Sequence, residues 1–591
     1  MSATTDTYTL LRALVDELAR CGMRHACTSP GSRSAPLVLT LAAERRLRCH
    51  SHVDERAAGF FALGVAKATG APVAVACTSG TAVAELLPAV IEAREARVPL
   101  VVLSADRPAE LRENGAGQAI DQLKIFGDAA KWFCEVELTG AEPEQLRWVR
   151  TLACRAYWTA LGGRPGVVHL NFPLREPLVS DEPLAPDATA RADGRAYVRR
   201  SARPAGDESA EGELAALVAG AHRGVIVAGR HERDTPLGRE AAAFAAAAGW
   251  PLLADPLSGA RRGPAAIAHY DALLRDGELA RRLTPDVVLR VGDLPVSKPL
   301  RSWLASLDAR QAALDPEGAW QDPASVLADS FTLEPAAALA ALARAGADAG
   351  AATGAGEPDW LGRWSSADRV AAEAILGVLG DGLSEPAVAR ELGVLLAEEA
   401  TLFVASSMPV RDIETFWPVR TDPPRVLCNR GANGIDGVVS SALGAAAASP
   451  DAPVVLLIGD VALAHDLGGL LACARLELEL TIVLLDNDGG GIFDFLPVAT
   501  AGIALEPEHL HPGESRFARH VSTPTGLNFA AAAALYGLAH ERASDIAGFR
   551  EALEHALARP GSSIVEVRGE RAANVALHGR VWDAVSAALS R

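Results

Sequence analysis

PVVLLIGDVALAHDLGGLLACARLELELTIVLLDNDGGGIFDFLP, residues 453–497, is the stretch that decides the fold. Its continuous apolar run at 454–458 predicts a buried strand, and the apolar periodicity from about 465 to 475 predicts a helix. A second apolar run at 480–485 predicts another strand. Two strands joined by one helix are parallel, so their carboxyl ends lie at the same edge of a sheet, where open α/β sheets bind ligands.

The polar residues after these two strands have the chemistry of a metal and phosphate site. Asp460 follows the first strand and Asn487, 27 residues later, follows the second, with three glycines behind it. A carboxylate, an amide oxygen and a main-chain carbonyl suit Mg²⁺, which takes further ligands from water and phosphate. The alternative is that Asp460 caps the next helix and the glycines form a plain turn. The spacing favours the metal site.

This spacing resembles the diphosphate-metal motif of the thiamine diphosphate (ThDP) enzymes. The longer strings GDVALAHDLGGL (459–470) and GGGIFDFLP (489–497) resemble one branch of them, the 2-succinyl-5-enolpyruvyl-6-hydroxy-3-cyclohexene-1-carboxylate (SEPHCHC) synthase family of the menaquinone pathway. The resemblance implies ThDP as cofactor with Mg²⁺, or Mn²⁺ in its place. At this edge it assigns, for the metal, Asp460, Asn487 and Gly489, for the cofactor also Gly459 and Val461, and for the substrate Ile492, Phe493 and Leu496.

Composition narrows the class of protein. The formal net charge of -18 and the pI near 5.3 argue against a nucleic-acid or membrane-surface protein, because phosphate backbones and anionic lipids attract positive charge. No charged-then-apolar leader opens the chain and no apolar run reaches about 18 residues, so we expect a cytoplasmic protein without a membrane segment. The eight cysteines form no C-x-x-C pair and no Cys/His cluster, and we assign them no chemistry.

With 591 residues the chain is long enough for several domains. Alternating strand and helix patterns predict an α/β protein, and the resemblance implies three doubly wound parallel-sheet domains of the ThDP-enzyme type. We expect a pyrimidine-binding domain at 1–180, a central domain at 205–342 and a diphosphate-binding domain at 359–591. The Pro-rich stretch 177–207 is predicted to be a linker, and the Ala/Gly-rich stretch 343–357 a flexible connector.

Glu55 stands where a short predicted strand, 49–53, gives way to a helix. Without further context, this glutamate is interpreted as an acid in the first helical turn that complements the helix dipole. The segment HVDERAAGFFALGVAKATG (52–70) resembles the ThDP enzymes over its whole length, and in them a glutamate at this place hydrogen-bonds a pyrimidine nitrogen and promotes the imino tautomer. The resemblance therefore assigns Glu55 as the catalytic residue and as a cofactor contact.

Three loops after predicted strands carry an arginine among polar and glycine residues: SPGSRS (29–34), SSMPVR (406–411) and NRGANGIDG (429–437). Such loops suit carboxylate or phosphate groups, since arginine binds a carboxylate through two hydrogen bonds. Ordinary turns and surface ion pairs are the alternative. The resemblance assigns substrate contacts to Ser32, Arg33, Arg107, Gln118, Lys298, Arg411 and Arg430, and cofactor contacts to Ser407 and Ile435.

The resemblance also implies a reaction. A SEPHCHC synthase is a transferase that decarboxylates 2-oxoglutarate with ThDP and adds the resulting succinyl-semialdehyde carbanion equivalent to isochorismate, giving SEPHCHC and CO₂. The substrates bring several carboxylates, and five cationic positions match that charge: Arg33, Arg107, Lys298, Arg411 and Arg430. Another ThDP carboligase such as acetolactate synthase is the main alternative, and a non-catalytic protein with the same fold is the second.

The resemblance also predicts the oligomeric state, and the sequence predicts a flap near the site. In the ThDP superfamily the cofactor lies between the first and third domains of different subunits, so we expect a homodimer or a dimer of dimers (a homotetramer). The polar segment from 498 to about 525 is predicted to be a flap, whose His509, His511 and His520 are loop residues rather than metal ligands. Departures from the family pattern stand at Glu85, Gly117, Pro299, Ala462, Gly468, Asp486 and Asp488.

Overall fold

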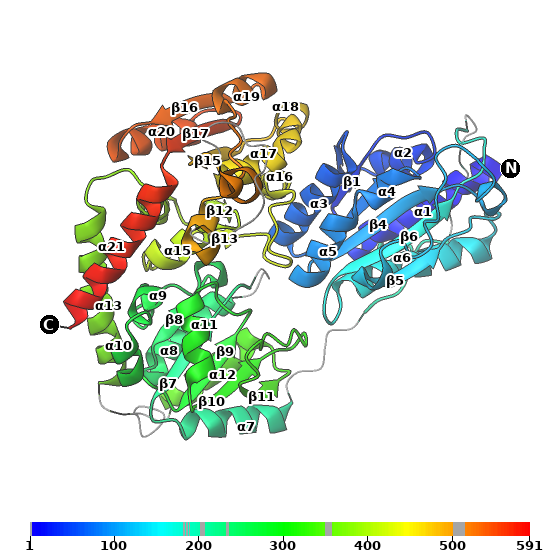
Figure 1. The fold of residues 1–591 in the computed structure, drawn as a ribbon. Helices are drawn as coiled ribbons and strands as arrows, with labels where there is room; N and C mark the ends of the chain where they lie inside the picture. The colour runs from blue at the N-terminus through cyan, green and yellow to red at the C-terminus, as the bar shows by residue number, and fades with distance from the viewer. Residues whose placement is uncertain are drawn as a thin grey trace. The chain divides into compact units, whose positions relative to one another are not determined.

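The computed structural model describes residues 3–180, 184, 187, 189–200, 207–231, 236–348, 357, 359–499 and 515–590. The chain separates into two compact units, and each is described by itself (Figure 1). Unit 1 consists of Met1–Arg203, Asn429–Asp451 and His465–Leu480, and unit 2 of Pro204–Cys428, Ala452–Ala464 and Thr481–Arg591. The three domain ranges given above stay predictions.

In unit 1 the described strands form a six-stranded parallel sheet. Its order is β2 (Arg48–Ser51), β1 (His25–Thr28), β3 (Val73–Cys77), β4 (Leu100–Asp106), β6 (Val167–Pro173) and β5 (Ala130–Glu135). Strands β3 and β4 are buried at every residue, as expected for apolar runs covered by helices on both faces.

Helices pack on both faces of this sheet. One face is covered by α1 (Ala3–Cys21), α2 (Ala35–Ala43) and α6 (Pro143–Leu161). The other side holds α3 (Glu55–Thr69), α4 (Thr81–Ala84) and α5 (Leu87–Ala96), and unit 1 also contains α16 (Val438–Ala448) and α18 (Leu471–Arg475). Helices α3 and α16 approach so closely that a Cβ on Gly64 would lie 1.9 Å from the carbonyl oxygen of Ser441. Glycine is required there for the two backbones to meet.

Unit 2 contains two parallel sheets among the described residues. The first has the order β11 (Leu327–Phe331), β10 (Arg310–Leu314), β9 (Val287–Val291), β7 (Gly224–Ala228) and β8 (Leu252–Ala254). One of its faces packs against α7 (Glu208–Ala219), α8 (Leu237–Ala248) and α12 (Pro335–Asp348). The opposite face packs against α9 (Tyr270–Leu273), α10 (Gly277–Arg282), α11 (Lys298–Ser306), α13 (Trp360–Leu379) and α21 (Arg571–Leu589).

The second sheet of unit 2 contains the strands of the opening stretch. Its order is β13 (Arg425–Leu427), β12 (Thr401–Val404), β14 (Val454–Gly459), β15 (Thr481–Asp486), β17 (Ser563–Arg568) and β16 (Ala539–Ala543). The hydrophobic core on one face comes from α14 (Glu385–Leu395), α15 (Met408–Phe416) and α20 (Ile546–Ala558). Helices α17 (Asp460–His465) and α19 (Phe529–Tyr536) complete the α-helices of the described chain.

Short helices of tighter or wider pitch join these elements. The 3₁₀ turns are η1 (Ala109–Leu111), η2 (Gly127–Ala129), η3 (Pro256–Ser258), η4 (Leu467–Leu470), η5 (Gly491–Phe495) and η6 (Pro497–Ala499). A π-helical turn, η7 (Ala518–Ser522), lies in the segment predicted to be a flap. Residues 500–514 of that segment, with His509 and His511, lie outside the described residues.

The fold-class prediction is confirmed: three parallel sheets with flanking helices are present in the described chain. Two predicted segment boundaries were wrong. The helix predicted over 465–475 begins instead at Asp460 and is interrupted by η4, because Gly468 and Gly469 weaken α-helical structure there. The connector predicted at 343–357 overlaps α12, which continues to Asp348 because its alanines are strong helix formers; 349–356 lie outside the described residues.

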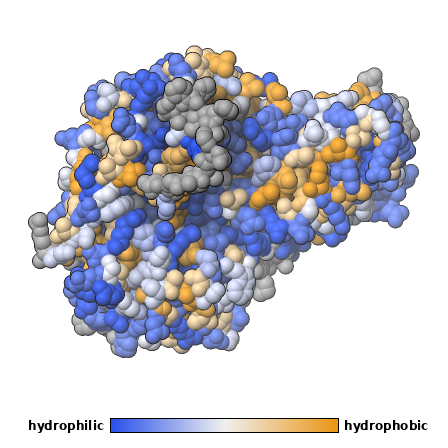
Figure 2. Space-filling view, in the orientation of Figure 1, coloured by the Kyte–Doolittle hydropathy of each residue, from blue (hydrophilic) through white to orange (hydrophobic). Residues whose placement is uncertain are grey.

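No helix of the described residues is both long enough and apolar enough to cross a membrane. Most of the visible surface is hydrophilic, but Figure 2 shows hydrophobic surface over unit 1, in the region that Figure 1 labels α4 and α5. Leu87 and Ile91, one turn apart on α5, are 36% and 39% exposed.

Candidate active site

The carboxyl ends of β14 and β15 bring the predicted metal ligands together. The two strands are adjacent and parallel, with Gly459 opposite Leu485, so that Asp460 and Asn487 both follow at one edge. The backbone N–H of Gly489 donates a 2.8 Å hydrogen bond to Oδ2 of Asp460. The loop after β15 therefore touches the carboxylate that ends β14, as the strand-helix-strand pattern predicts.

Asp460 is a buried acid, only 1% exposed. Burial raises its pKa to about 6, the neighbouring Asp486 carboxylate adds to the rise, and hydrogen bonds from the backbone of Gly489 and Val461 oppose it. A buried carboxylate is costly unless a cation pairs with it. The site thus suits a bound cation.

Asn487 points to the same conclusion. Its Nδ2 donates a 2.7 Å hydrogen bond to Oε1 of Glu385, whereas its Oδ1 is buried and has no hydrogen-bond partner among the described residues. Such an acceptor costs about 1–3 kcal/mol when it stays unpaired. An amide oxygen beside a carboxylate and a main-chain carbonyl is a donor set for Mg²⁺.

The glycines around these ligands leave room for a ligand. Gly489 has φ 142°, and a Cβ there would lie 2.8 Å from the backbone oxygen of Ser522, so a side chain is excluded. At Gly459, by contrast, an added Cβ would meet no described atom within 4 Å. Open space at the end of β14 is compatible with a diphosphate beside the cation, and the residues present fit the ThDP–metal group.

Ser407 follows β12, the strand next to β14, and so belongs to the same edge. Its φ of 74° and ψ of -134° are unusual for a residue other than glycine, and such strain is concentrated at functional sites. Nη1 of Arg411 donates to the Ser407 carbonyl at 2.6 Å. Ile492 and Phe493 lie half-buried in η5, and Leu496 is 45% exposed directly after it.

Glu55 is the first residue of α3 in unit 1 and is half-buried. Burial raises its pKa, its own backbone N–H opposes this, and the carboxylates of Asp54 and Glu85 add to the rise. Asp54 caps the helix by accepting from the backbone of Arg56 and Ala57. Capping is therefore performed by Asp54, and the raised pKa suits a Glu55 carboxyl that donates a proton to a ring nitrogen.

Three predicted substrate residues converge in unit 1. Arg33 is 5% exposed and donates to the Leu174 carbonyl and to Glu176, while its Nε is buried without a partner in the described chain. Burial lowers its pKa, and the nearby Arg107 guanidinium lowers it further. Arg107 donates to the carbonyl of Gly117, and the Gln118 amide donates to the carbonyl of Ser79.

Gly117, one of the departures from the family pattern, thus contributes a main-chain contact to Arg107. Ser32 is exposed beside the buried Arg33. Arg430 and Ile435 belong to the part of unit 1 before α16, where the backbone of Gly431 and Ala432 donates to the buried carboxylate of Glu92. Lys298 is exposed at the start of α11 in unit 2.

The candidate residues are divided between the units. Unit 1 holds Ser32, Arg33, Glu55, Arg107, Gln118, Arg430 and Ile435. Unit 2 holds Lys298, Ser407, Arg411, Gly459, Asp460, Val461, Asn487, Gly489, Ile492, Phe493 and Leu496.

Family descriptions match most of the chain. "Thiamine pyrophosphate enzyme, N-terminal TPP binding domain" matches residues 8–125, "Middle domain of thiamine pyrophosphate" matches 200–404, and "Thiamine pyrophosphate enzyme, C-terminal TPP binding domain" matches 410–567. Among curated relatives, the 2-succinyl-5-enolpyruvyl-6-hydroxy-3-cyclohexene-1-carboxylate synthase of Geobacillus kaustophilus is 45% identical over 98% of both chains. The chain belongs to this synthase family.

Other members of the synthase family are similar over the same length. The Listeria monocytogenes synthase is 41% identical over 98% of this chain and 97% of its own, and that of Chloroflexus aurantiacus is 42% identical over 98% and 96%. The family predicted from the motifs is confirmed. The residue assignments within it stay predictions.

Glu385 contacts the candidate metal ligand Asn487 and was not identified from the sequence. It is 5% exposed, and Asn487, which it accepts from, lies 102 residues away. In the sequence Glu385 is only an acid that follows the N-cap residue Ser384, which is a common helix start. No local signal marks the long-range contact.

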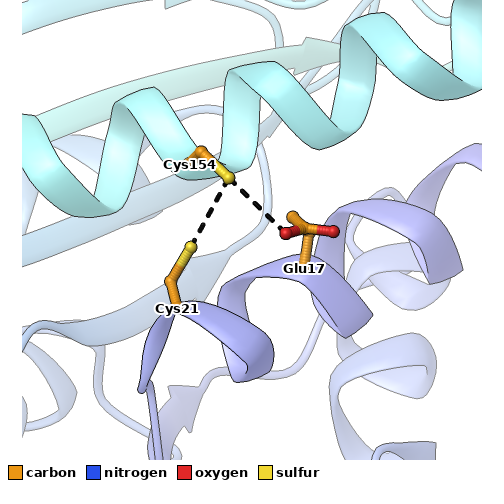
Figure 3. A group of neighbouring side chains, drawn as sticks. All are labelled: Glu17, Cys21 and Cys154. Carbon is orange, nitrogen blue, oxygen red and sulfur yellow. Dashed lines mark hydrogen bonds between the residues drawn. The ribbon is translucent and has the colours of Figure 1, made fainter. Parts of the chain in front are cut away.

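The fold also brings together two of the cysteines to which we assigned no chemistry. Cys21 and Cys154 lie 3.6 Å apart through their sulfur atoms, and Cys154 donates to Oε1 of Glu17 at 3.5 Å (Figure 3). All three are buried, and among the described residues they are the one group of three His, Cys, Asp or Glu side chains whose ligand atoms lie within 4.8 Å of one another. Glu17 already accepts from Arg150 and from the backbone of Tyr197, so the hydrogen bonds joining α1 and α6 explain the cluster.

Proposed function

We propose that this protein is a transferase that decarboxylates 2-oxoglutarate with ThDP and Mg²⁺ and adds the remaining succinyl-semialdehyde unit to isochorismate. SEPHCHC and CO₂ are the products, in menaquinone biosynthesis. The observation that carries the proposal is the unpaired buried oxygen of Asn487 beside the buried Asp460, in the described part of a chain that belongs to the SEPHCHC synthase family.

The residues divide the work. ThDP, when bound, supplies a nucleophilic carbon for the 2-oxo acid and an electron sink for the departure of CO₂. Asp460, Asn487 and the Gly489 carbonyl would hold a Mg²⁺ ion beside the diphosphate. Glu55 would hold a proton at its carboxyl group for a pyrimidine nitrogen of the bound cofactor, a role that its raised pKa supports.

The cationic side chains bind substrate carboxylates. Arg33 has a buried Nε with no partner in the described residues, and Arg107 lies near it. Lys298, Arg411 and Arg430 supply the other positive positions. Each charge-assisted hydrogen bond is worth about 1.5–3 kcal/mol, so this set favours substrates with several carboxylates over pyruvate, the donor of acetolactate synthase.

The protein acts as a homodimer or a dimer of dimers, in the cytoplasm. Its candidate residues are divided between two units. Leu87 and Ile91 are exposed on α5, and exposed apolar side chains of this kind are typical of subunit interfaces. Sedimentation velocity would measure the assembly directly. A monomer at micromolar concentration would contradict it.

The test is CO₂ release from 2-oxoglutarate, with ThDP and Mg²⁺, in the presence and absence of isochorismate. We expect turnover that requires isochorismate and falls about a hundredfold or more in Glu55→Gln. Glu208→Gln is the matched control, because Glu208 follows the capping Asp207 on α7 as Glu55 follows Asp54 on α3. Use of pyruvate without an effect of isochorismate would favour an acetolactate synthase-like enzyme instead.

A further inference from the structure

Glu385 and Asn487 make a buried contact that has a direction. Glu385 is the first residue of α14, Asn487 follows β15, and both belong to unit 2. Nδ2 of Asn487 lies 2.7 Å from Oε1 of Glu385. In this contact the NH₂ end of the Asn487 amide faces Glu385, and a carboxyl oxygen of Glu385 accepts the hydrogen bond.

This direction fixes the other end of the amide. With Nδ2 held by Glu385, Oδ1 faces away from it, and this oxygen is buried with no partner among the residues described. An amide turned by 180° would present N–H groups where a cation needs an oxygen ligand. The chemistry of the Asn487 amide toward a metal therefore depends on Glu385.

Gly491 supplies the space for this arrangement. A Cβ at Gly491 would lie 2.8 Å from Nδ2 of Asn487, closer than real Cβ contacts. The absent side chain leaves the NH₂ group free to reach Glu385. Two features that are distant in sequence from each other, an acid on α14 and a glycine in η5, therefore act on the same amide group.

We propose that Glu385 is a positioning residue that orients the Asn487 amide so that Oδ1 faces the metal. The inference rests on the metal site of the proposed function. Residues behind a ligand that fix its orientation change metal affinity by about 10–100-fold when they are replaced. Glu385 itself contacts no reacting atom in this assignment.

The test is Mn²⁺ binding to the full chain, measured from the free Mn²⁺ signal by electron paramagnetic resonance in the presence of ThDP. Glu385→Ala is expected to raise the Kd for Mn²⁺ about 10–100-fold. Glu385→Gln can still accept from Nδ2 through its amide oxygen and is expected to stay within about threefold of the original protein. Gly491→Ala, which crowds Nδ2, is expected to weaken binding as well.

Glu391→Ala is the matched control. Glu391 lies on the same helix, is 4% exposed and is paired with Arg390 and Arg550 instead of the site, so its loss affects helix packing but not Asn487. Circular dichroism confirms that each variant is folded. Unchanged Mn²⁺ affinity in Glu385→Ala, or equal weakening in Glu385→Gln and Glu385→Ala, would overturn the inference alone. Absence of Mn²⁺ binding to the original protein would overturn the metal site and this inference with it.

Discussion

Unit 1 and unit 2 each contain a buried cluster of acids, but the two clusters are paired very differently. In unit 1, Arg150 is 2% exposed and donates to Asp16, Glu17 and Asp187 at 2.5–2.7 Å. One guanidinium with five N–H donors thereby serves three carboxylates. None of these four side chains appears among the buried, unpaired polar groups of the described chain.

The cluster in unit 2 surrounds Glu385 and is incompletely paired. Burial raises the pKa of Glu385 to about 7, and the carboxylate of Asp412 adds to this rise. His578 lies 3.0 Å from Oδ1 of Asp412 and, through Nδ1, donates to the Asn574 carbonyl. Within the described residues, Oδ2 of Asp412 and Oδ1 of Asn487 remain without hydrogen-bond partners.

This difference in hydrogen-bond pairing indicates that the cluster in unit 1 is structural and the cluster in unit 2 is functional. The Arg150 cluster joins α1, α6 and the segment that contains Asp187, and its satisfied hydrogen bonds explain it as a structural element of unit 1. The Glu385 cluster lies next to the carboxyl ends of β14 and β15, the edge where α/β sheets bind ligands. Under the proposed function, a bound cation would complete the unpaired oxygen of Asn487 at this edge.

The largest expected effect is the loss of activity in Asp460→Ala. Removing a metal ligand forfeits several kcal/mol of stabilisation, so the rate of CO₂ release should fall about 10⁴-fold. Asp460→Asn, which keeps one oxygen, should lose less. Asp451→Ala is the control, because Asp451 is exposed at the amino end of β14, away from the ligand edge. Activity in Asp460→Ala close to that of the original protein would contradict a functional role for the ligand edge of unit 2.

Arg150→Met should produce the second effect, a loss of stability without a loss of activity per folded molecule. The buried Glu17 and the half-buried Asp187 would lose their arginine, while Asp16 would keep Arg20 and Arg46, at a cost of about 3 kcal/mol to the free energy of unfolding of unit 1. Hydrogen exchange of the β4 and β6 amides in urea measures this unit directly. A clear fall in the rate of CO₂ release per folded molecule would mean that the cluster is functional as well as structural.

The smallest expected effect is the pH dependence of that loss. Burial pushes the pKa of Asp16 and Asp187 upward, but hydrogen bonds, including those from Arg150, outweigh it and hold both below the usual 3.8. The stability that these acids contribute is therefore present above about pH 3.8 and is lost only as the pH falls below it.

In Arg150→Met the influence of burial remains while that of the guanidinium is gone, so the pKa values of the acids rise and protonation starts at higher pH. The free-energy difference between variant and original protein should then shrink by about 1 kcal/mol between pH 7 and pH 4.5. The same exchange measurement, repeated across this range, checks it. A constant difference would mean that the acids are not desolvated in the variant.

Much of the fold was predictable because apolar runs report strands that helices cover on both faces. The runs at 454–458 and 480–485 became β14 and β15, and Asp460 and Asn487 met at their carboxyl ends as the parallel arrangement requires. The short strands β8 and β11 and the long helices α13 and α21 were missed. Strand β11 alternates between half-buried and exposed residues at a sheet edge and has no continuous apolar run.

The sequence by itself determined the family, the order of the strands that carry the ligands and the residue types at their ends. These follow from local periodicity and from fixed spacings, such as the 27 residues from Asp460 to Asn487, which the chain records directly. The tertiary structure alone decided which buried groups are paired. Glu385 reaches Asn487 across 102 residues, and Arg150 reaches Asp16 across 134. Such contacts depend on how helices dock onto sheets, and no local pattern encodes that geometry.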